Sequence, residues 1–302
     1  MKAKYFAQLL AVSALWGASF PMLRVAAPEM GATVTALMRV SIGAATLALL
    51  MRVLGQRWPW QSWRELTLLG MGSVGLPYLL FCYAATKAPA GYLALLNPSA
   101  VVFAVLSSAW FKEDRLDAGK VLGCILGFLG LSLVVQLGPV APTTDVLLGA
   151  GAAILGTFFY GASAPFQKRA TRHIEPLAIA GPMHLSAMLL IAPFGLWGLP
   201  QAHFTPTGVG LVMVLGVVTS GLAYWIHLRI LRHVTPVAAV TPIFFVPVFG
   251  VAWSYLFLGE PVSAGTFVGG AIVLLASSGI HANGLSLARK LAERLAEGYL
   301  TE

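Results

Sequence analysis

The sequence predicts an all-α membrane protein with ten transmembrane helices, arranged as two inverted five-helix repeats. Three observations lead to this prediction: an apolar composition, ten hydrophobic runs of membrane-spanning length, and short motifs that recur at a nearly constant offset. Of the 302 residues, 58% are hydrophobic and only 10% are charged, whereas a soluble domain has about 25% charged residues. We therefore expect most of the surface to face lipid.

Each hydrophobic run supplies the ~20 apolar residues that a helix needs to cross the hydrocarbon core. Because lipid offers no partner to an unpaired peptide group, each run is expected to be a helix. The first run has an alternative, since Lys2 and Lys4 before a leucine-rich stretch also resemble a cleaved signal peptide. A related copy deeper in the chain favours a permanent span. The predicted spans are 5–23, 32–51, 66–86, 90–111, 118–137, 146–164, 177–199, 207–228, 236–258 and 264–283.

The positions of the cations predict the orientation of the chain. With a cytoplasmic N-terminus, 16 of the 19 Lys and Arg fall at the cytoplasmic ends of spans, while the opposite ends hold only Arg24 and Lys87. Arg39 lies within a span. This asymmetry obeys the positive-inside rule, and it predicts a multi-pass protein of the plasma membrane (the inner membrane of a bacterium) with both termini in the cytoplasm. It also accounts for the net charge of +8 without a nucleic-acid partner.

Short motifs recur in one order, 144 to 146 residues apart. WGASFP at 16–21 returns as YGASAP at 160–165, and LGMGSVGLPY at 69–78 returns as LGVVTSGLAY at 215–224. A register kept over a hundred residues indicates a duplication. Since each copy contains five spans, an odd number, the second copy enters the bilayer from the opposite side, as in many secondary transporters. The predicted units are two repeats, 1–138 and 145–284, and a cytoplasmic amphipathic tail, 285–302.

In these motifs the chain resembles the EamA branch of the drug/metabolite transporter superfamily. The likeness rests on WGASFP, on Arg39, on Asn97-Pro98 and the following Glu-Asp-Arg, and on Thr241-Pro242 and Gly-Glu260-Pro in the second half. It extends over residues 5–283. The resemblance implies transport of small metabolites, with amino acid and drug efflux as the commonest activities in the family.

Polar and aromatic groups at depth predict the place of a substrate cavity between the halves. An Arg inside a span costs about 2.5–3.5 kcal/mol, so Arg39 is expected either to bind a carboxylate or act as a gate, or to bond carbonyls of a broken helix. Deep Tyr and Trp also need polar partners, and proline kinks expose backbone groups near a site. The predicted substrate-binding residues are Trp16, Ser19, Arg39, Tyr78, Tyr83, Asn97, Tyr160, Ser163, His184, Tyr224, Thr241 and Phe245. The predicted helix breaks are Pro21, Pro98, Pro165 and Pro242.

The predicted function is export of small amphipathic metabolites, with amino acids the best single candidate, by alternating access. The alternatives are a proton-coupled exporter of drugs or other metabolites, and a channel or lipid scramblase. No metal-ligand spacing and no cofactor motif is present, and the span centres carry no Asp or Glu, so we expect neither an enzyme nor strong proton coupling. The expected partners are a small-molecule substrate and the bilayer; a monomer and a dimer both remain open.

Overall fold

The computed structural model of the chain describes residues 3–112, 143–232 and 241–262, together with isolated positions at 125, 126, 129, 141, 268, 271 and 272. The predicted spans 118–137 and 264–283 and the predicted tail 285–302 lie, apart from those positions, outside the described residues. All regular structure within the described ranges is helical. Seven helical runs there are long and apolar enough to cross a membrane.

The first half begins with two long helices, joined at Gly31 in a single-residue turn whose φ of 80° suits glycine. The third predicted span is an α–π–α succession. The fourth is interrupted at Asn97 and Pro98, between two shorter helices. The bounds are α1 (Ala3–Met30), α2 (Ala32–Val53), η1 (Trp60–Ser62), α3 (Trp63–Gly70), the π-helix η2 (Met71–Gly75), α4 (Leu76–Lys87), α5 (Ala90–Leu96) and α6 (Ser99–Trp110).

The second half repeats this order where it is described. A long helix is followed by a second one, and then by another α–π–α succession. Helices α1 and α8 run without a break through Pro21 and Pro165, two of the predicted helix breaks, whereas Pro98 separates α5 from α6. The bounds are α8 (Thr144–Ala170), α9 (Pro176–Gly198), η3 (Leu199–Gln201), α10 (Pro206–Val214), the π-helix η4 (Leu215–Leu222), α11 (Ala223–Leu231) and α13 (Thr241–Leu258).

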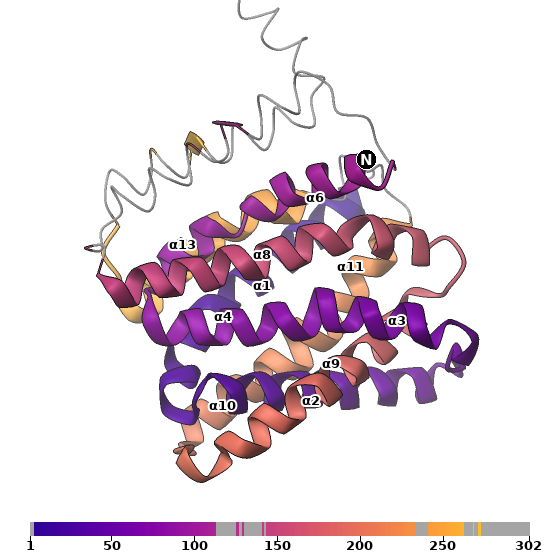
Figure 1. Ribbon diagram of the computed structural model, residues 1–302, viewed down its shortest axis with the longest axis horizontal. Coiled ribbons are helices and arrows are strands. Elements are labelled where there is room, and N and C mark those ends of the chain that lie inside the picture. Colours follow the sequence, from indigo (N-terminus) through magenta and orange to yellow (C-terminus); the bar gives the residue numbers. More distant parts are fainter. Residues whose placement is uncertain are drawn as a thin grey trace, which may run out of the picture.

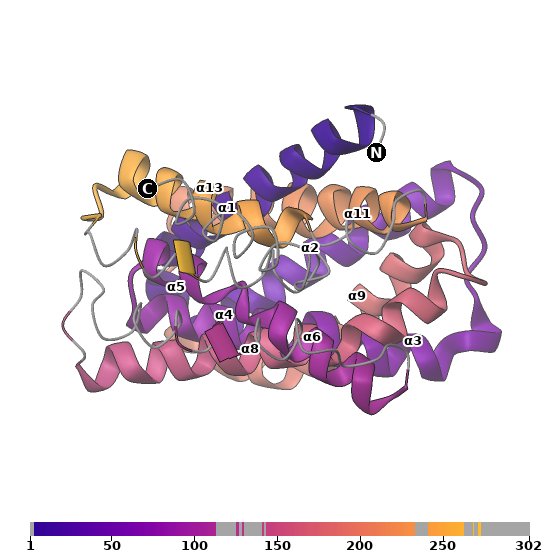
Figure 2. The same cartoon turned by 90° about the horizontal axis from the view of Figure 1, so that it is seen from above.

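The helices form two layers, and α2 and α9 lie together at one edge of the bundle, where they join the layers (Figures 1 and 2). We call α1, α10, η4, α11 and α13 the α1 layer, and α3, η2, α4, α6 and α8 the α8 layer. Helices α2 and α9 pack on each other and contact both layers. Each layer therefore combines one long helix from one half of the chain with two spans from the other half.

The packing within one layer has an equivalent in the other. Helix α1 packs along α13, and α8 packs along α6. Glycines at the same place in the two copies of the hexapeptide permit this close approach: a Cβ on Gly17 would lie 2.7 Å from Phe249 Cβ, and one on Gly161 would lie 2.6 Å from Phe103 Cβ. The hexapeptide is thus a helix-packing motif, and its small residue allows backbones to touch.

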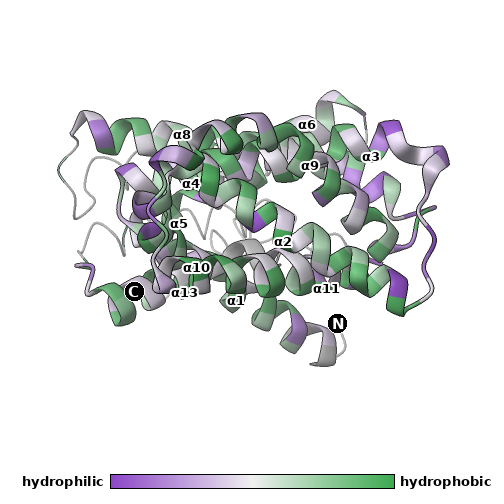
Figure 3. Ribbon diagram, turned by 90° about the horizontal axis from the view of Figure 1, so that it is seen from below, coloured by the Kyte–Doolittle hydropathy of each residue, from purple (hydrophilic) through white to green (hydrophobic). Residues whose placement is uncertain are grey.

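The outer surface has the character expected of a membrane protein. Large apolar side chains are exposed along the helices, among them Leu49, Leu189 and Phe257, at 61%, 60% and 70%. Figure 3 shows hydrophobic colouring along most helices, with hydrophilic residues gathered at several helix ends. Such a surface is stable only against lipid. The chain is a multi-pass membrane protein.

Candidate functional site

The centre of the bundle holds a buried arginine that connects the two layers. Arg39 of α2 is 6% exposed. Its Nε donates to Ser220 Oγ at 2.9 Å and an Nη donates to Thr219 Oγ1 at 3.4 Å, both in the α1 layer. The guanidinium carbon lies 3.9 Å from the ring centroid of Tyr78, in the α8 layer. One side chain therefore contacts both layers.

The positive charge of Arg39 is not neutralised within the described residues, where no carboxylate forms an ion pair with it. The π face of Tyr78 and two neutral hydroxyls stabilise the cation instead. A guanidinium has five N–H donors, and the two hydrogen bonds use two of them. The arrangement favours a further anionic partner with oxygen acceptors.

A histidine from α9 contacts the same tyrosine ring as this arginine. His184 of α9 is fully buried, and its ring makes edge contacts with Tyr78 and Tyr224, at centroid distances of 6.1 and 5.0 Å. Its Nδ1 donates to the carbonyl of Ala180 at 2.9 Å, so Nε2 is the unprotonated nitrogen of the neutral ring; that atom is buried and has no hydrogen-bond partner among the described residues. We call Arg39, Tyr78, His184, Ser220 and Tyr224 the central cluster.

The recurring decapeptides, residues 69–78 and 215–224, explain how Tyr78 and Tyr224 reach the same point. Each decapeptide contains a π-helical segment, η2 or η4, just before its tyrosine. Glycines at equivalent positions allow these segments to pack closely on α9 and α2. Gly70 contacts Met183 of α9, and Gly216 contacts Ile42 of α2. π-Helical turns often occur at functional sites, because they displace side chains from regular helical positions.

Further polar and aromatic residues extend the central cluster into both layers. Trp16 donates through Nε1 to the carbonyl of Thr219 at 3.2 Å. Gln167 of α8 donates to the Tyr224 hydroxyl at 3.2 Å, so it links the α8 layer to the α1 layer. Tyr160 is half-buried and lies 6.1 Å from the ring of Phe81.

The other predicted site residues lie on α1, α4, α8 and α13 or at the α5–α6 break, and some are only partly described. Ser19 donates to its own helix, at Leu15 O, and Tyr83 is 38% exposed. Asn97 is half-buried at the α5–α6 break, and Ser163 and Phe245 are half-buried on α8 and α13. Thr241 and Pro242 begin α13, but the structure describes only their backbone.

Thr219, Ser220 and Gln167 are not among the residues predicted from the sequence. The first two stand inside the recurring decapeptide, at positions where the first copy has Ser73 and Val74. Two adjacent hydroxyl residues inside an apolar, duplicated motif were the available signal. Gln167 follows the second hexapeptide by two residues, and nothing in the spacing distinguished it from a residue at the membrane surface.

One end of the bundle, which we call the Glu260 end, is closed by one contact between the halves and one within the first half. Glu260 follows α13, and its two carboxylate oxygens each accept a hydrogen bond at 2.8 Å, from the backbone N–H groups of Ala90 and Gly91 in α5. Arg24 of α1 donates to the carbonyl of Ala85 at 2.8 Å. A cavity of about 420 Å³ lies beside these contacts. The distribution of cations predicts that this end faces outward.

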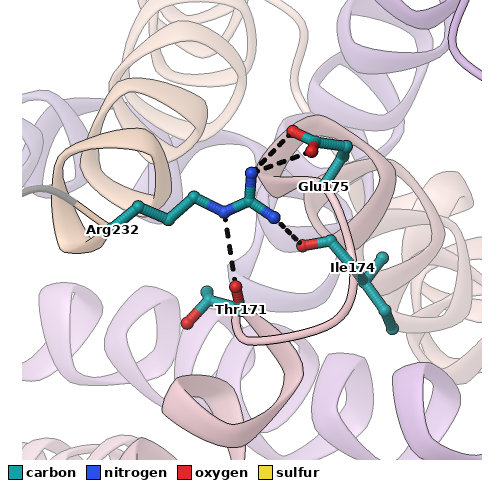
Figure 4. A network of polar contacts seen from close by, with 4 residues as sticks. All are labelled: Thr171, Ile174, Glu175 and Arg232. Atoms are coloured by element: carbon teal, nitrogen blue, oxygen red, sulfur yellow. Dashed lines mark hydrogen bonds and ion pairs between the residues drawn. The ribbon is translucent and has the colours of Figure 1, made fainter.

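The opposite end, the Arg232 end, has a network within the second half (Figure 4). Arg232 donates to both oxygens of Glu175, at 2.8 and 2.9 Å, and to the carbonyls of Ile174 and Thr171, at 2.8 and 3.3 Å. The network ties the end of α11 to the α8–α9 turn. A cavity of about 230 Å³ is lined in part by Trp225, Arg229 and Arg232.

Comparison with known proteins gives a consistent picture. The profile described as "EamA-like transporter family" matches residues 4–136 and again 147–281. The uncharacterized transporter YoaV of Bacillus subtilis is 21% identical, over 93% of this chain and 97% of its own. A probable terminal-alkyne amino-acid exporter of Streptantibioticus cattleyicolor is 25% identical, over 85% and 86%.

The pseudopaline exporter CntI of Pseudomonas aeruginosa strain UCBPP-PA14 is 25% identical, over 89% of this chain and 93% of its own. A solved crystal structure superposes with a TM-score of 0.66, at 18% identity, over 93% of this chain and 99% of the other. At that identity the likeness concerns the fold alone.

Proposed function

The chain belongs to the EamA-like transporter family, and from that premise we propose that it exports small carboxylate-bearing metabolites, with amino acids as the substrate class. Transport proceeds by alternating access, in which the two layers move about the α2–α9 pair. The central cluster binds the substrate. Two of the relatives bear the names of exporters, one of them an amino-acid exporter, and this supports the direction and the class.

The observation that carries the proposal is that the described partners of the buried Arg39 cation are all uncharged. A buried guanidinium that has only hydroxyl and aromatic partners is suited to a carboxylate that arrives with the substrate. The rings of Tyr78 and Tyr224 supply apolar surface for the rest of the molecule. Because Arg39 contacts one layer through hydroxyls and the other through a ring, a carboxylate bound there interacts with both layers.

The proposed movement rests on an inverted repeat. The matched packing of α1–α13 and α8–α6, the two π-helical segments and the two separate profile matches all support such a repeat. Two similar halves of opposite orientation exchange conformations to open alternately to each side. For release at the Glu260 end, the contacts of Glu260 with α5 and of Arg24 with α4 must break.

We further propose that the protein lies in the inner membrane with both termini in the cytoplasm, and that transport follows the substrate's own gradient. The positions of Lys and Arg support the orientation. None of the five residues that define the central cluster is an Asp or Glu, so the cluster as defined lacks the carboxylate that usually exchanges protons. His184 is the one titratable imidazole in the cluster as defined.

The proposal is tested by counterflow in proteoliposomes. Vesicles loaded with unlabelled L-phenylalanine are diluted into radiolabelled L-phenylalanine, and parallel vesicles are tested with phenethylamine, which is the same molecule without its carboxylate. We expect saturable counterflow of phenylalanine and none of phenethylamine. Equal counterflow of the amine means that the carboxylate is not recognised, and non-saturable flux of both indicates a channel. Either result overturns the proposal.

A further inference from the structure

A second polar site lies at the Glu260 end, apart from the central cluster. The cavity of about 420 Å³ is walled by α1, α5 and α13 and by the residues after α13. Its volume falls within the ~300–1,000 Å³ range of small-molecule sites. Most of its wall is apolar, but Arg24 and Glu260 line it as well.

The two charged residues retain capacity for a ligand. Arg24 uses one of its donors on the carbonyl of Ala85, and a guanidinium has five. Each carboxylate oxygen of Glu260 accepts one backbone N–H, while the two oxygens together have about four lone pairs. No ion pair joins Arg24 to Glu260 in the part of the chain that the structure describes. Opposite charges thus line one cavity without neutralising each other directly.

A third group at this cavity points independently to a ligand. Tyr92 of α5 lines the cavity and is 2% exposed, and its buried hydroxyl has no hydrogen-bond partner within the described ranges. An unsatisfied buried hydroxyl costs about 1–3 kcal/mol, so a bound polar group that supplies its partner is favourable. Val25, Leu95 and Val251 provide apolar wall for a short side chain.

We propose that this cavity is a binding site for a free zwitterionic amino acid, whose carboxylate pairs with Arg24 and whose ammonium group pairs with Glu260. The site is distinct from the central cluster, since the two share no residue. Its role as an exit site for exported substrate rests on the proposed function; the binding itself does not. Because Glu260 also holds the first turn of α5, an ammonium group bound there competes with the contact that closes this end.

The test is equilibrium binding of radiolabelled L-leucine to the full chain in phosphatidylcholine nanodiscs. The chain carries Arg39→Gln, so that the central cluster lacks its cation. We expect one saturable site per chain, which isoamylamine (no carboxylate) and N-acetyl-leucine (no ammonium group) do not compete for. Adding Arg24→Gln or Glu260→Gln should weaken binding about tenfold or more, because each removes one charged partner while keeping a polar side chain.

Matched controls use charged residues at the same end that do not line the cavity, namely Glu29→Gln and Lys87→Gln, and these should leave the affinity unchanged. Tyr92→Phe should weaken it less than either charge substitution. Absence of saturable leucine binding, or binding unaffected by both charge substitutions, overturns the inference. Displacement of leucine by added phosphatidylethanolamine would identify a lipid headgroup as the occupant and overturn it too.

The two proposals fail separately. If the unmodified chain exchanges phenylalanine but the Arg39→Gln chain binds no leucine, the second site is refuted and the proposed function stands. If the Arg39→Gln chain binds leucine but the unmodified chain exchanges no amino acid, the site stands and the proposed function is refuted.

Discussion

Replacing Arg39 by lysine separates the role of its charge from the role of its shape. Arg39 directs Nε and one Nη to two different hydroxyls, at 2.9 and 3.4 Å, while its plane lies over Tyr78. Lysine keeps the charge but carries its donors on a single nitrogen, so it cannot hold both hydroxyls and a bidentate carboxylate together. The substitution therefore removes at least one charge-assisted hydrogen bond to the substrate.

The size of the effect follows from that count. One hydrogen bond to a charged group contributes about 1.5–3 kcal/mol, which corresponds to a roughly 10- to 150-fold weaker affinity at ~1.4 kcal/mol per factor of ten. The concentration dependence of phenylalanine counterflow measures it as a rise in the half-saturating concentration. Arg39→Gln removes the charge as well, and we expect it to abolish saturable counterflow.

The matched control is Arg229→Lys, because Arg229 is exposed near the end of α11, and it should leave the half-saturating concentration unchanged. Membrane abundance of all three variants is measured in parallel, so that a folding defect is not mistaken for a binding defect. A half-saturating concentration for Arg39→Lys within twofold of the unmodified chain would refute the reasoning, since it would mean that the geometry of the guanidinium is not used.

Three further predictions concern orientation, energy and packing. A membrane-impermeant maleimide should label Asp145→Cys in intact cells and label Arg172→Cys only after permeabilisation; labelling of both in intact cells contradicts the proposed orientation. An imposed pH gradient should not drive phenylalanine above equilibrium in proteoliposomes; accumulation that His184→Ala abolishes would establish proton coupling instead. Gly161→Ala should lower the melting temperature in detergent by about 2–10 °C, from ~1–3 kcal/mol of overpacking. Gly151→Ala on the same helix should not, because no described residue lies within 4 Å of a Cβ placed there. Equal melting temperatures for the two variants would show that Gly161 makes no close contact.

Much of the fold was open to prediction because lipid imposes simple requirements. Composition predicted a helical membrane protein, and the positions of the apolar runs agree with the described helices to within a few residues at most ends. The largest difference is at α1, which extends to Met30 although the predicted span ended at residue 23. The run after residue 23 contains Arg24 and Pro28, but Arg24 satisfies its donor at a carbonyl of α4, so the helix continues.

The site was only partly predictable, because distances between helices are not encoded in local spacing. Intramembrane Arg39 and the duplicated tyrosines were identifiable one by one, since each violates a rule for residues in lipid. Their meeting depends on π-helical segments and on glycine contacts that no periodicity indicates. The same holds for Glu260, whose place in a turn gave no sign that its carboxylate caps a helix from the other half.

The composition of the α1 layer has a consequence for how the chain assembles during synthesis. The indole of Trp253 in α13 donates to the carbonyl of Ala14 in α1, a partner 239 residues earlier in the chain. At about 5–20 residues per second, the ribosome needs roughly 10–50 s to make the helix that α1 packs against. Throughout that interval the stripe of α1 that contains Gly17 must be covered by lipid or by the insertion machinery. A chain that stops before α13 leaves this stripe without the helix on which it packs in the complete fold.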